Sequence, residues 1–324
     1  MRLIEAENLD SIDSYRMVER EVPMPGKGQA LIRVKACGVG YVDALVALGK
    51  YQVKPPLPHT PGMEIAGVIE ALGEDTGALK VGQRVLAQAP GGFAEAVMVA
   101  PALIVPIPDR MSFAQAAAFR VNYLTALHGL QDRARLASGE TLLVTGSAGG
   151  VGLAAVQLGA LMGARVIACA STEEKRAFAQ AHGASEVIDT TPEGWRDRLK
   201  ALTGGKGPNV IFDPVCGPLF EPAFRSIAWG GRHLVVGFAG GPIPALPANL
   251  TLMKGAGLLG VDVRQFMMFE WQRAAAHVET LLSWVEEGRL VPVPGRVFPF
   301  NAYRDALSFA LSGKGMGKTI LEIG

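Results

Sequence analysis

Short apolar runs separated by glycine and proline dominate the first 110 residues of the chain. Val, Ile and Leu are frequent in the runs, and Pro55, Pro56, Pro58 and Pro61 fall between the runs rather than inside them. Because proline removes a backbone donor, this placement is typical of strands joined by loops. The pattern predicts an antiparallel, loop-rich β domain with strands at residues 31–37, 64–72, 83–88 and 94–99.

The hydrophobic pattern changes after residue 111. Ser112 and Gln115 have the spacing of a capping box, which predicts the start of a helix at this point. Apolar strand-like runs then alternate with helical spacing, a pattern typical of a doubly wound parallel sheet. The six predicted strands are residues 141–145, 165–170, 186–188, 209–213, 232–237 and 257–261.

The last part of the chain breaks this alternation. Apolar residues at helical spacing predict one long helix over 271–287, and strand-and-proline texture returns after Gly288. We therefore expect the tail to pack onto the first domain and to bury Val297 and Phe298 there. The predicted domains are residues 1–121, residues 122–260, and a returning segment of residues 261–324.

Composition narrows the class of partner. The chain has 324 residues, 49% of them hydrophobic, and 31 basic against 30 acidic side chains, so no global field favours nucleic acid or a membrane surface. We expect a small-molecule partner. Three cysteines without close spacing, and no apolar signal segment in the first ten residues, predict a cytoplasmic protein. The uncharged stretch 141–164 contains six glycines and is interpreted as strand, turn and helix rather than as a membrane span.

A glycine-rich turn follows the first strand of the parallel sheet. Glycine permits a tight turn and leaves room for a phosphate to approach the backbone, while the N-terminus of the next helix offers N–H donors and a positive dipole end. The strand–turn–helix context predicts pyrophosphate binding; the alternative is a turn that serves only close packing. The predicted cofactor-binding residues are Gly146, Ser147, Ala148, Gly149, Gly150, Val151 and Gly152.

The end of the second strand distinguishes the two nicotinamide cofactors. NAD enzymes place an acidic residue there to bind the ribose 2′-hydroxyl. Here the strand ends in Ser171, with Lys175 and Arg176 one turn later, which favours a 2′-phosphate and therefore NADPH. The alternative is that Ser171 only caps the helix, with Glu174 completing a capping box, and that Lys175 is solvated.

Four further segments occur in order along the chain before the glycine turn: CGVGYVD (37–43), PGMEIAG (61–67), GGFAE (91–95) and NYLTA (122–126). With these segments the sequence resembles the zinc-independent NADPH:quinone oxidoreductases of the medium-chain dehydrogenase/reductase superfamily. The resemblance spans nearly the whole chain and implies a doubly wound α/β Rossmann domain inserted into a GroES-like β-rich catalytic domain, with the active site in the cleft. It also implies a homodimer.

The zinc alcohol dehydrogenases of this superfamily differ at two positions. By resemblance they have a Cys where this chain has Gly40 and a His where it has Met63. Glycine and a thioether do not replace thiolate and imidazole at a catalytic zinc, and no C-x-x-C pair is present for a structural zinc. We therefore expect no metal site.

Chemistry without a metal favours conjugated acceptors. Hydride addition to a quinone or an enone gives a delocalised anion, which hydrogen-bond donors stabilise without a Lewis acid. Tyr51 is the predicted substrate-side donor, Asp43 an orienting carboxylate, and Tyr41 a further candidate in the same region. The alternative is that both tyrosines only pack the wall of the cleft. Gly40 also replaces an asparagine of the family, which removes one polar contact to the nicotinamide.

The resemblance adds further cofactor contacts. It places the side chain of Thr125 toward the nicotinamide and the backbone after the fifth parallel strand near the carboxamide. Those backbone residues are Gly237, Phe238 and Ala239. Weaker candidates for cofactor contacts are Asn249 and Lys318. Arg120 either guards the cleft or forms a salt bridge with a neighbouring residue.

Three functions remain open on the sequence. The first is a quinone reductase, the second an enone or enoyl-thioester reductase. The third, from another class, is an NADPH-binding sensor or structural protein with little turnover.

Overall fold

The computed structural model describes all residues, 1–324, and divides into two compact units. The first unit comprises Met1–Arg120 and Val291–Gly324, and the second comprises Val121–Leu290. The second unit is thus an insertion in the first. The chain returns to the first unit at Val291, whereas the sequence placed the returning segment from residue 261.

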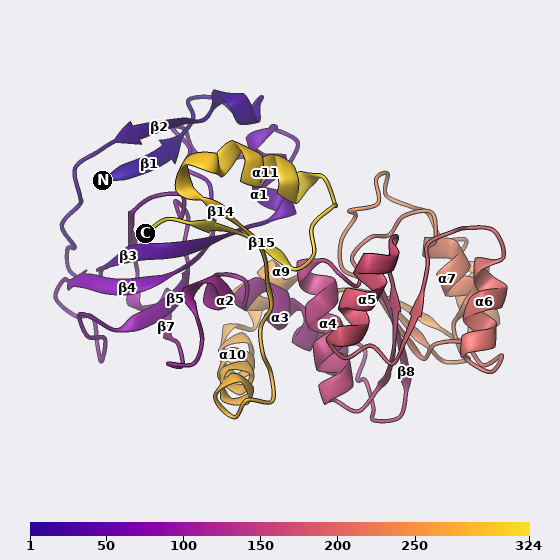
Figure 1. The fold of residues 1–324 in the computed structure, drawn as a ribbon. Coiled ribbons are helices and arrows are strands. Elements are labelled where there is room, and N and C mark those ends of the chain that lie inside the picture. The colour runs from indigo at the N-terminus through magenta and orange to yellow at the C-terminus, as the bar shows by residue number, and fades with distance from the viewer. The chain divides into compact units, whose positions relative to one another are not determined.

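A mixed sheet of seven strands forms the first unit. Its order is β14-β15-β3-β4-β5-β7, and β6 pairs with β3. The C-terminal strand β15 runs antiparallel beside β3, the yellow and indigo strands of Figure 1, so the tail completes this sheet. The strands are β3 (Ala30–Val39), β4 (Glu64–Leu72), β5 (Arg84–Gln88), β6 (Ala96–Val99), β7 (Ile104–Pro106), β14 (Pro294–Pro299) and β15 (Lys318–Glu322).

Smaller elements surround this sheet. The antiparallel pair β1 (Arg2–Glu5) and β2 (Arg16–Glu19) forms a separate two-stranded sheet. Helix α2 (Phe113–Ala117) begins at Ser112, whose hydroxyl and the Gln115 side chain form the predicted capping box. The other helices are α1 (Tyr41–Ala47) and α11 (Tyr303–Leu311).

The core of the first unit shows why the tail is needed. Ile32, Ile65 and Leu321, from three different strands, are at most 1% exposed and belong to one hydrophobic cluster. Phe298 is buried in that cluster as predicted, but the prediction for Val297 is wrong because this side chain is 45% exposed. Successive residues of a strand point to opposite faces, so the two neighbours cannot both face the core.

The second unit contains a six-stranded parallel sheet in the order β10-β9-β8-β11-β12-β13. This doubly wound Rossmann order confirms the predicted fold class. All six predicted strands are present, as β8 (Thr141–Thr145), β9 (Arg165–Cys169), β10 (Glu186–Ile188), β11 (Val210–Asp213), β12 (Arg232–Val235) and β13 (Gly257–Gly260).

Helices accompany this parallel sheet, and apolar side chains such as Leu143, Ile167, Ile211 and Phe224 form a fully buried core cluster. Helix α4 packs against β8 and β9. No helix of the protein is both long and apolar enough to cross a membrane. The helices are α3 (Arg120–Leu127), a π-helix (His128–Arg133), α4 (Gly150–Leu161), α5 (Glu173–Ala181), α6 (Trp195–Leu202), α7 (Phe220–Ser226), α8 (Asn249–Lys254), α9 (Val263–Phe269) and α10 (Trp271–Glu286).

The burial difference within the tail gives a first prediction. We expect Leu321→Ala to lower the free energy of unfolding by about 2–5 kcal/mol, because it leaves a cavity in the core of the first unit. Val297→Ala, the matched control on the exposed face of β14, is expected to cost less than about 1 kcal/mol. Urea unfolding of both variants measures the difference. Equal effects would contradict the assignment of β15 to this core.

Candidate functional site

The turn between β8 and α4 is shaped by two glycines. Gly146 has a φ of 55°, in the left-handed region that favours glycine. A Cβ added to Gly152 would lie 2.2 Å from the carbonyl oxygen of Gly146, which is closer than atoms can approach. The first turn of α4 therefore packs directly on the backbone of the loop, and only glycine fits at residue 152.

This turn fits a pyrophosphate group. Gly149 is the N-cap of α4, with no side chain to cover the helix end. The first N–H groups of a helix have no acceptor within the helix and point outward at its positive dipole end. The side-chain amide of Asn122 lies behind Gly150, 2.7 Å from an ideal Cβ there, so one side of the turn is filled and supported.

Two predicted side chains in the turn are structural. Ser147 is fully buried, and its hydroxyl donates a hydrogen bond to the carbonyl oxygen of Cys169 at 3.1 Å. The backbone N–H of Ser147 donates to the same oxygen at 3.3 Å. Ala148 is 2% exposed. Because these groups tie the turn to the end of β9, a ligand contact of Ser147 or Ala148 is limited to the backbone.

The corner after β9 differs from the capping interpretation given above. Thr172, not Ser171, is the N-cap of α5, and its hydroxyl accepts a hydrogen bond from the Lys175 N–H at 3.2 Å. The helix begins one residue later than a Ser171 cap requires, so Lys175 rather than Glu174 occupies the third helical position. The capping alternative for Ser171 is therefore wrong. Ser171 is exposed beside the strand end.

A guanidinium group lies at the same corner. Arg176 donates from Nη1 to the carbonyl oxygen of Ala170 at 3.1 Å, which holds this cation next to Ser171. Lys175 is half-buried one residue earlier. The corner thus combines a hydroxyl group and two cations.

A buried carboxylate at the carboxyl end of β11 contacts both neighbouring strands, β8 and β12. Asp213, at the end of β11, accepts hydrogen bonds from the hydroxyl of Thr145 and from the N–H of Cys216 at 2.8 Å, and pairs with His233 Nε2 at 3.1 Å. Burial raises the pKa of Asp213, but the hydrogen bonds and the histidine outweigh it, and the pKa lies below its usual range. Sequence reasoning missed this residue, although an acidic residue closing an apolar strand was a usable signal.

The loop that Asp213 anchors supports the segment after β12. The Ala239 N–H donates to the carbonyl oxygen of Pro214 at 3.3 Å, and a Cβ on Gly237 would lie 3.2 Å from that oxygen. Phe238 is 42% exposed. The predicted contacts at residues 237–239 therefore lie at the carboxyl edge of the parallel sheet, where ligands bind in open α/β sheets.

Thr125, the remaining predicted cofactor contact, is buried in α3. Its hydroxyl donates to the carbonyl oxygen of Val121 at 2.6 Å, one turn earlier in the same helix. The proton of this hydroxyl is thus already used inside the helix, and an acceptor lone pair remains for a ligand.

The first unit contains the predicted substrate-side residues. Asp43 lies in the first turn of α1 and accepts hydrogen bonds from the N–H groups of Gly40 at 2.7 Å and Gly62 at 3.3 Å. Burial raises the pKa of this carboxyl, while the charge of Lys318 and both N–H donors oppose the rise. Asp43 therefore joins two turns, which agrees with an orienting rather than a proton-donating role.

Lys318 and Glu64 form a buried ion pair next to Asp43. The ammonium Nζ lies 2.5 Å from Glu64 Oε2, and the two side chains are 11% and 7% exposed. Arg120 also acts electrostatically with Glu64, and donates to the carbonyl oxygen of Leu103 at 3.0 Å. The sequence suggested Lys318 only as a weak cofactor candidate and did not foresee its pairing with Glu64.

The two tyrosines lie at either end of α1. Tyr41 is its first residue and is 38% exposed, whereas Tyr51 follows the helix and is half-buried. Both remain predictions as substrate-side donors.

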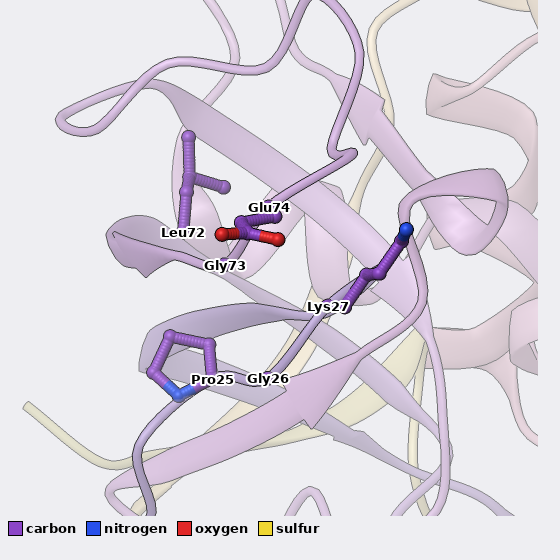
Figure 2. Close-up of a pocket in the computed structure, with 6 residues that line it drawn as sticks. All are labelled: Pro25, Gly26, Lys27, Leu72, Gly73 and Glu74. Atoms are coloured by element: carbon purple, nitrogen blue, oxygen red, sulfur yellow. The ribbon is translucent and has the colours of Figure 1, made fainter.

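A shallow hollow in the first unit lies apart from these residues. It has a volume of about 500 Å³ and is lined by Pro25, Gly26, Lys27, Leu72, Gly73 and Glu74 (Figure 2). Glu64 and Leu72 are the two ends of β4, roughly 25 Å apart at about 3.3 Å per residue. A Cβ on Gly73 would lie 1.8 Å from the Gly26 carbonyl oxygen, so close packing of two turns explains these glycines.

Comparisons with known proteins agree with this arrangement. Residues 26–109 match the family described as the alcohol dehydrogenase GroES-like domain, and residues 150–280 match the zinc-binding dehydrogenase family. A quinone oxidoreductase-like protein 2 homolog of Nematostella vectensis is 38% identical over 92% of this chain and 82% of its own length. Human quinone oxidoreductase is 36% identical over 93% of this chain and 91% of its own length. The chain belongs to the quinone oxidoreductase family.

A solved structure of this family is similar over the whole chain. Quinone oxidoreductase from Thermus thermophilus, which was also solved as a complex with NADPH, has a TM-score of 0.85 and 32% identity, covering 99% of this chain and 100% of its own. The family resemblance and the fold expected from the sequence are thereby confirmed.

This member of the quinone oxidoreductase family does not have zinc-binding side chains at the positions that the resemblance assigns to zinc ligands. Gly40 and Met63 offer no ligand, and no group of three His, Cys, Asp or Glu side chains is arranged to hold a metal ion. A Cβ on Gly40 would lie 3.2 Å from Lys318 Nζ, so an ammonium group lies next to that position.

The glycine turn gives the prediction of this subsection. We expect Gly152→Ala to destabilise the protein by about 1–3 kcal/mol, because the new methyl group overlaps the Gly146 carbonyl and the turn must shift. Gly149→Ala is the matched control, since an added Cβ there has its nearest contact at 3.4 Å and the φ of −75° suits alanine. Thermal unfolding without cofactor measures both. An unchanged Gly152→Ala variant would contradict the described packing.

Proposed function

We propose that the protein is an NADPH-dependent, zinc-independent oxidoreductase that passes hydride to a small conjugated acceptor, with a quinone as the preferred acceptor. The observation that carries the proposal is the glycine turn at the N-terminus of α4, whose N-cap residue, Gly149, has no side chain to cap the first N–H groups. Full-length relatives named quinone oxidoreductases support the choice of acceptor.

The corner after β9 supports NADPH as the cofactor. It offers the exposed Ser171 hydroxyl and the cations of Lys175 and Arg176, and no acidic side chain directly follows the strand. A 2′-phosphate with nearly two negative charges matches this set better than a 2′-hydroxyl. The NADPH complex of the Thermus relative also supports NADPH as the cofactor.

The chemistry assigned to the chain is binding, orientation and stabilisation of negative charge. NADPH supplies the hydride from C4 of its nicotinamide. Tyr51 is the proposed donor to the acceptor oxygen, and Tyr41 is a second candidate from the start of α1. Asp43 orients the turn that carries Tyr41 through its bonds to Gly40 and Gly62.

The proposal includes a cytoplasmic homodimer. The three cysteines, Cys37, Cys169 and Cys216, are buried and free, as expected in a reducing compartment. Strand β13 is an edge of the parallel sheet, with Leu258 40% exposed on it. An uncovered edge strand is a surface that a second copy can extend.

The cofactor preference is testable at Lys175. We expect NADPH to bind more tightly than NADH, and Lys175→Ala to weaken NADPH roughly 10- to 100-fold while leaving NADH unchanged, because one charge-assisted contact is worth about 1.5–3 kcal/mol. Fluorescence titration measures both constants. Lys206→Ala is the control, since Lys206 is exposed in the loop that leads into the amino end of β11. Equal affinity for the two cofactors in the wild type would refute the assignment.

The acceptor is tested by a panel. NADPH consumption is measured with quinones, enones and enoyl thioesters, and we expect the highest kcat/KM for a quinone. A preference for enones or enoyl thioesters would replace the quinone assignment with the alkene reductase. No turnover with any member, together with tight NADPH binding, would favour the sensor or structural role, for which no specific observation in the structure speaks.

A further inference from the structure

An unusual concentration of buried charge surrounds Gly40. Asp43, Glu64 and Lys318 lie on three different elements, α1, β4 and β15; Glu64 is buried, and Asp43 and Lys318 are half-buried. Buried charges are costly unless they are paired. The cluster therefore needs a reason beyond stability, since apolar residues would pack there at less cost.

The geometry centres on the missing side chain of residue 40. An ideal Cβ on Gly40 would lie 3.2 Å from Asp43 Oδ2 and 3.2 Å from Lys318 Nζ. Carboxylate and ammonium therefore lie within 3.2 Å of one point and occupy the side on which a residue-40 side chain would project. A side chain at residue 40 would need the Asp43 and Lys318 side chains to move by a few tenths of an ångström.

The ammonium is held from two sides. Glu64 Oε2 accepts a hydrogen bond from Lys318 Nζ, and Asp43 lies close enough to act on it electrostatically. The lysine stem passes over Gly38, where an added Cβ would lie 3.0 Å from Lys318 Cε. Lys318 thus faces two carboxylates from a strand that pairs directly with β3, while Arg120 acts on Glu64 alone.

We propose that Lys318 is the resident cation of this site: a positioning residue that faces the carboxylates of Asp43 and Glu64 and so holds the turn from Gly40 to Asp43 in the shape its function needs. The proposal rests on the proposed function for its catalytic consequence only. It also accounts for the poor fit to zinc, because the space beside residue 40 already contains a positive charge.

The role predicts a specific response to charge removal. Without Lys318, Asp43 loses the positive charge that favours its ionised form, which raises the pKa of Asp43 further. A protonated Asp43 loses acceptor strength toward the Gly40 and Gly62 N–H groups, and the turn loosens. The groups that face Asp43 are Lys318 from β15, Glu64 from β4, Cys37 from β3 and Tyr15 before β2, and Arg120 faces Glu64.

The experiment compares Lys318→Met, which removes the charge, with Lys318→Met/Glu64→Gln, which removes the second carboxylate as well. Lys318→Arg keeps the charge. Lys314→Met is the matched control, since Lys314 is exposed in the turn before β15. Each variant is assayed for kcat with NADPH and the best acceptor from pH 6 to 9, for NADPH affinity by fluorescence, and for melting temperature without cofactor.

We expect Lys318→Met to lose at least tenfold in kcat at pH 6 and to regain much of it by pH 9, as Asp43 ionises. Between pH 6 and pH 9, the melting temperature of Lys318→Met should fall by roughly 3–8 °C more than that of the wild type. The reason is that the pKa of Asp43 in the folded variant lies above its value in the unfolded chain, and such a group makes the free energy of unfolding decline as pH rises. Glu64→Gln in the same chain should restore part of both profiles, because burial still raises the pKa of Asp43 when the Glu64 charge is gone. NADPH affinity should change less than threefold. Lys318→Arg and Lys314→Met should keep the wild-type profiles.

Other results overturn the proposal. A kcat loss that is equal at all pH values and is not restored by Glu64→Gln would show a merely structural lysine. A tenfold loss of NADPH affinity with unchanged kcat would make Lys318 a cofactor contact. If Lys318→Met does not fold, a folded double variant supports the proposal and an unfolded one contradicts it. The melting profiles need no turnover, so failure of the proposed function, seen as an inactive wild type, is distinguished from failure of this inference.

Discussion

The antiparallel pairing of β15 with β3 joins the last strand of the chain to one formed near its beginning, with Glu322 opposite Ala36 and Thr319 opposite Val39. Closing so long a loop is costly in entropy, and the apolar core that includes Ile32 and Leu321 offsets that cost. The same pairing makes the parallel-sheet unit an insertion within the first unit. It also places Lys318 beside the strand that leads into the Gly40 turn.

The candidate functional residues of the two units are positioned by different interactions. In the second unit, backbone atoms make the phosphate turn, and Gly152 is required because its neighbour is a carbonyl oxygen. The carboxylate of Asp213 then fixes the strand ends around that turn. In the first unit the interactions are between charged side chains: the Lys318 ammonium attracts the carboxylates of Glu64 and Asp43. Residues 40 and 63 are not zinc ligands in this chain, and the ammonium group of Lys318 provides a fixed positive charge beside residue 40.

Sequence reasoning succeeded where the signal is local. The strand runs, the Ser112 cap and the glycine turn each follow from a few adjacent residues, and all are present in the structure. It failed where one residue of register matters, as at Thr172, which caps α5 in place of Ser171, and at Val297, which alternation turns outward. The Glu64–Lys318 pair was not predictable, because it joins residues from two distant strands whose register only the folded sheet defines.

The proposed reaction is hydride transfer from NADPH, with a lysine rather than a metal ion as the fixed cation of the first unit. The most direct measurement is quinone-dependent oxidation of NADPH by protein dialysed exhaustively against chelator, with the zinc content of the same sample determined by elemental analysis. We expect the dialysed protein to keep full activity at a zinc content far below one ion per chain. Activity that disappears on chelation and returns only with stoichiometric zinc would contradict it.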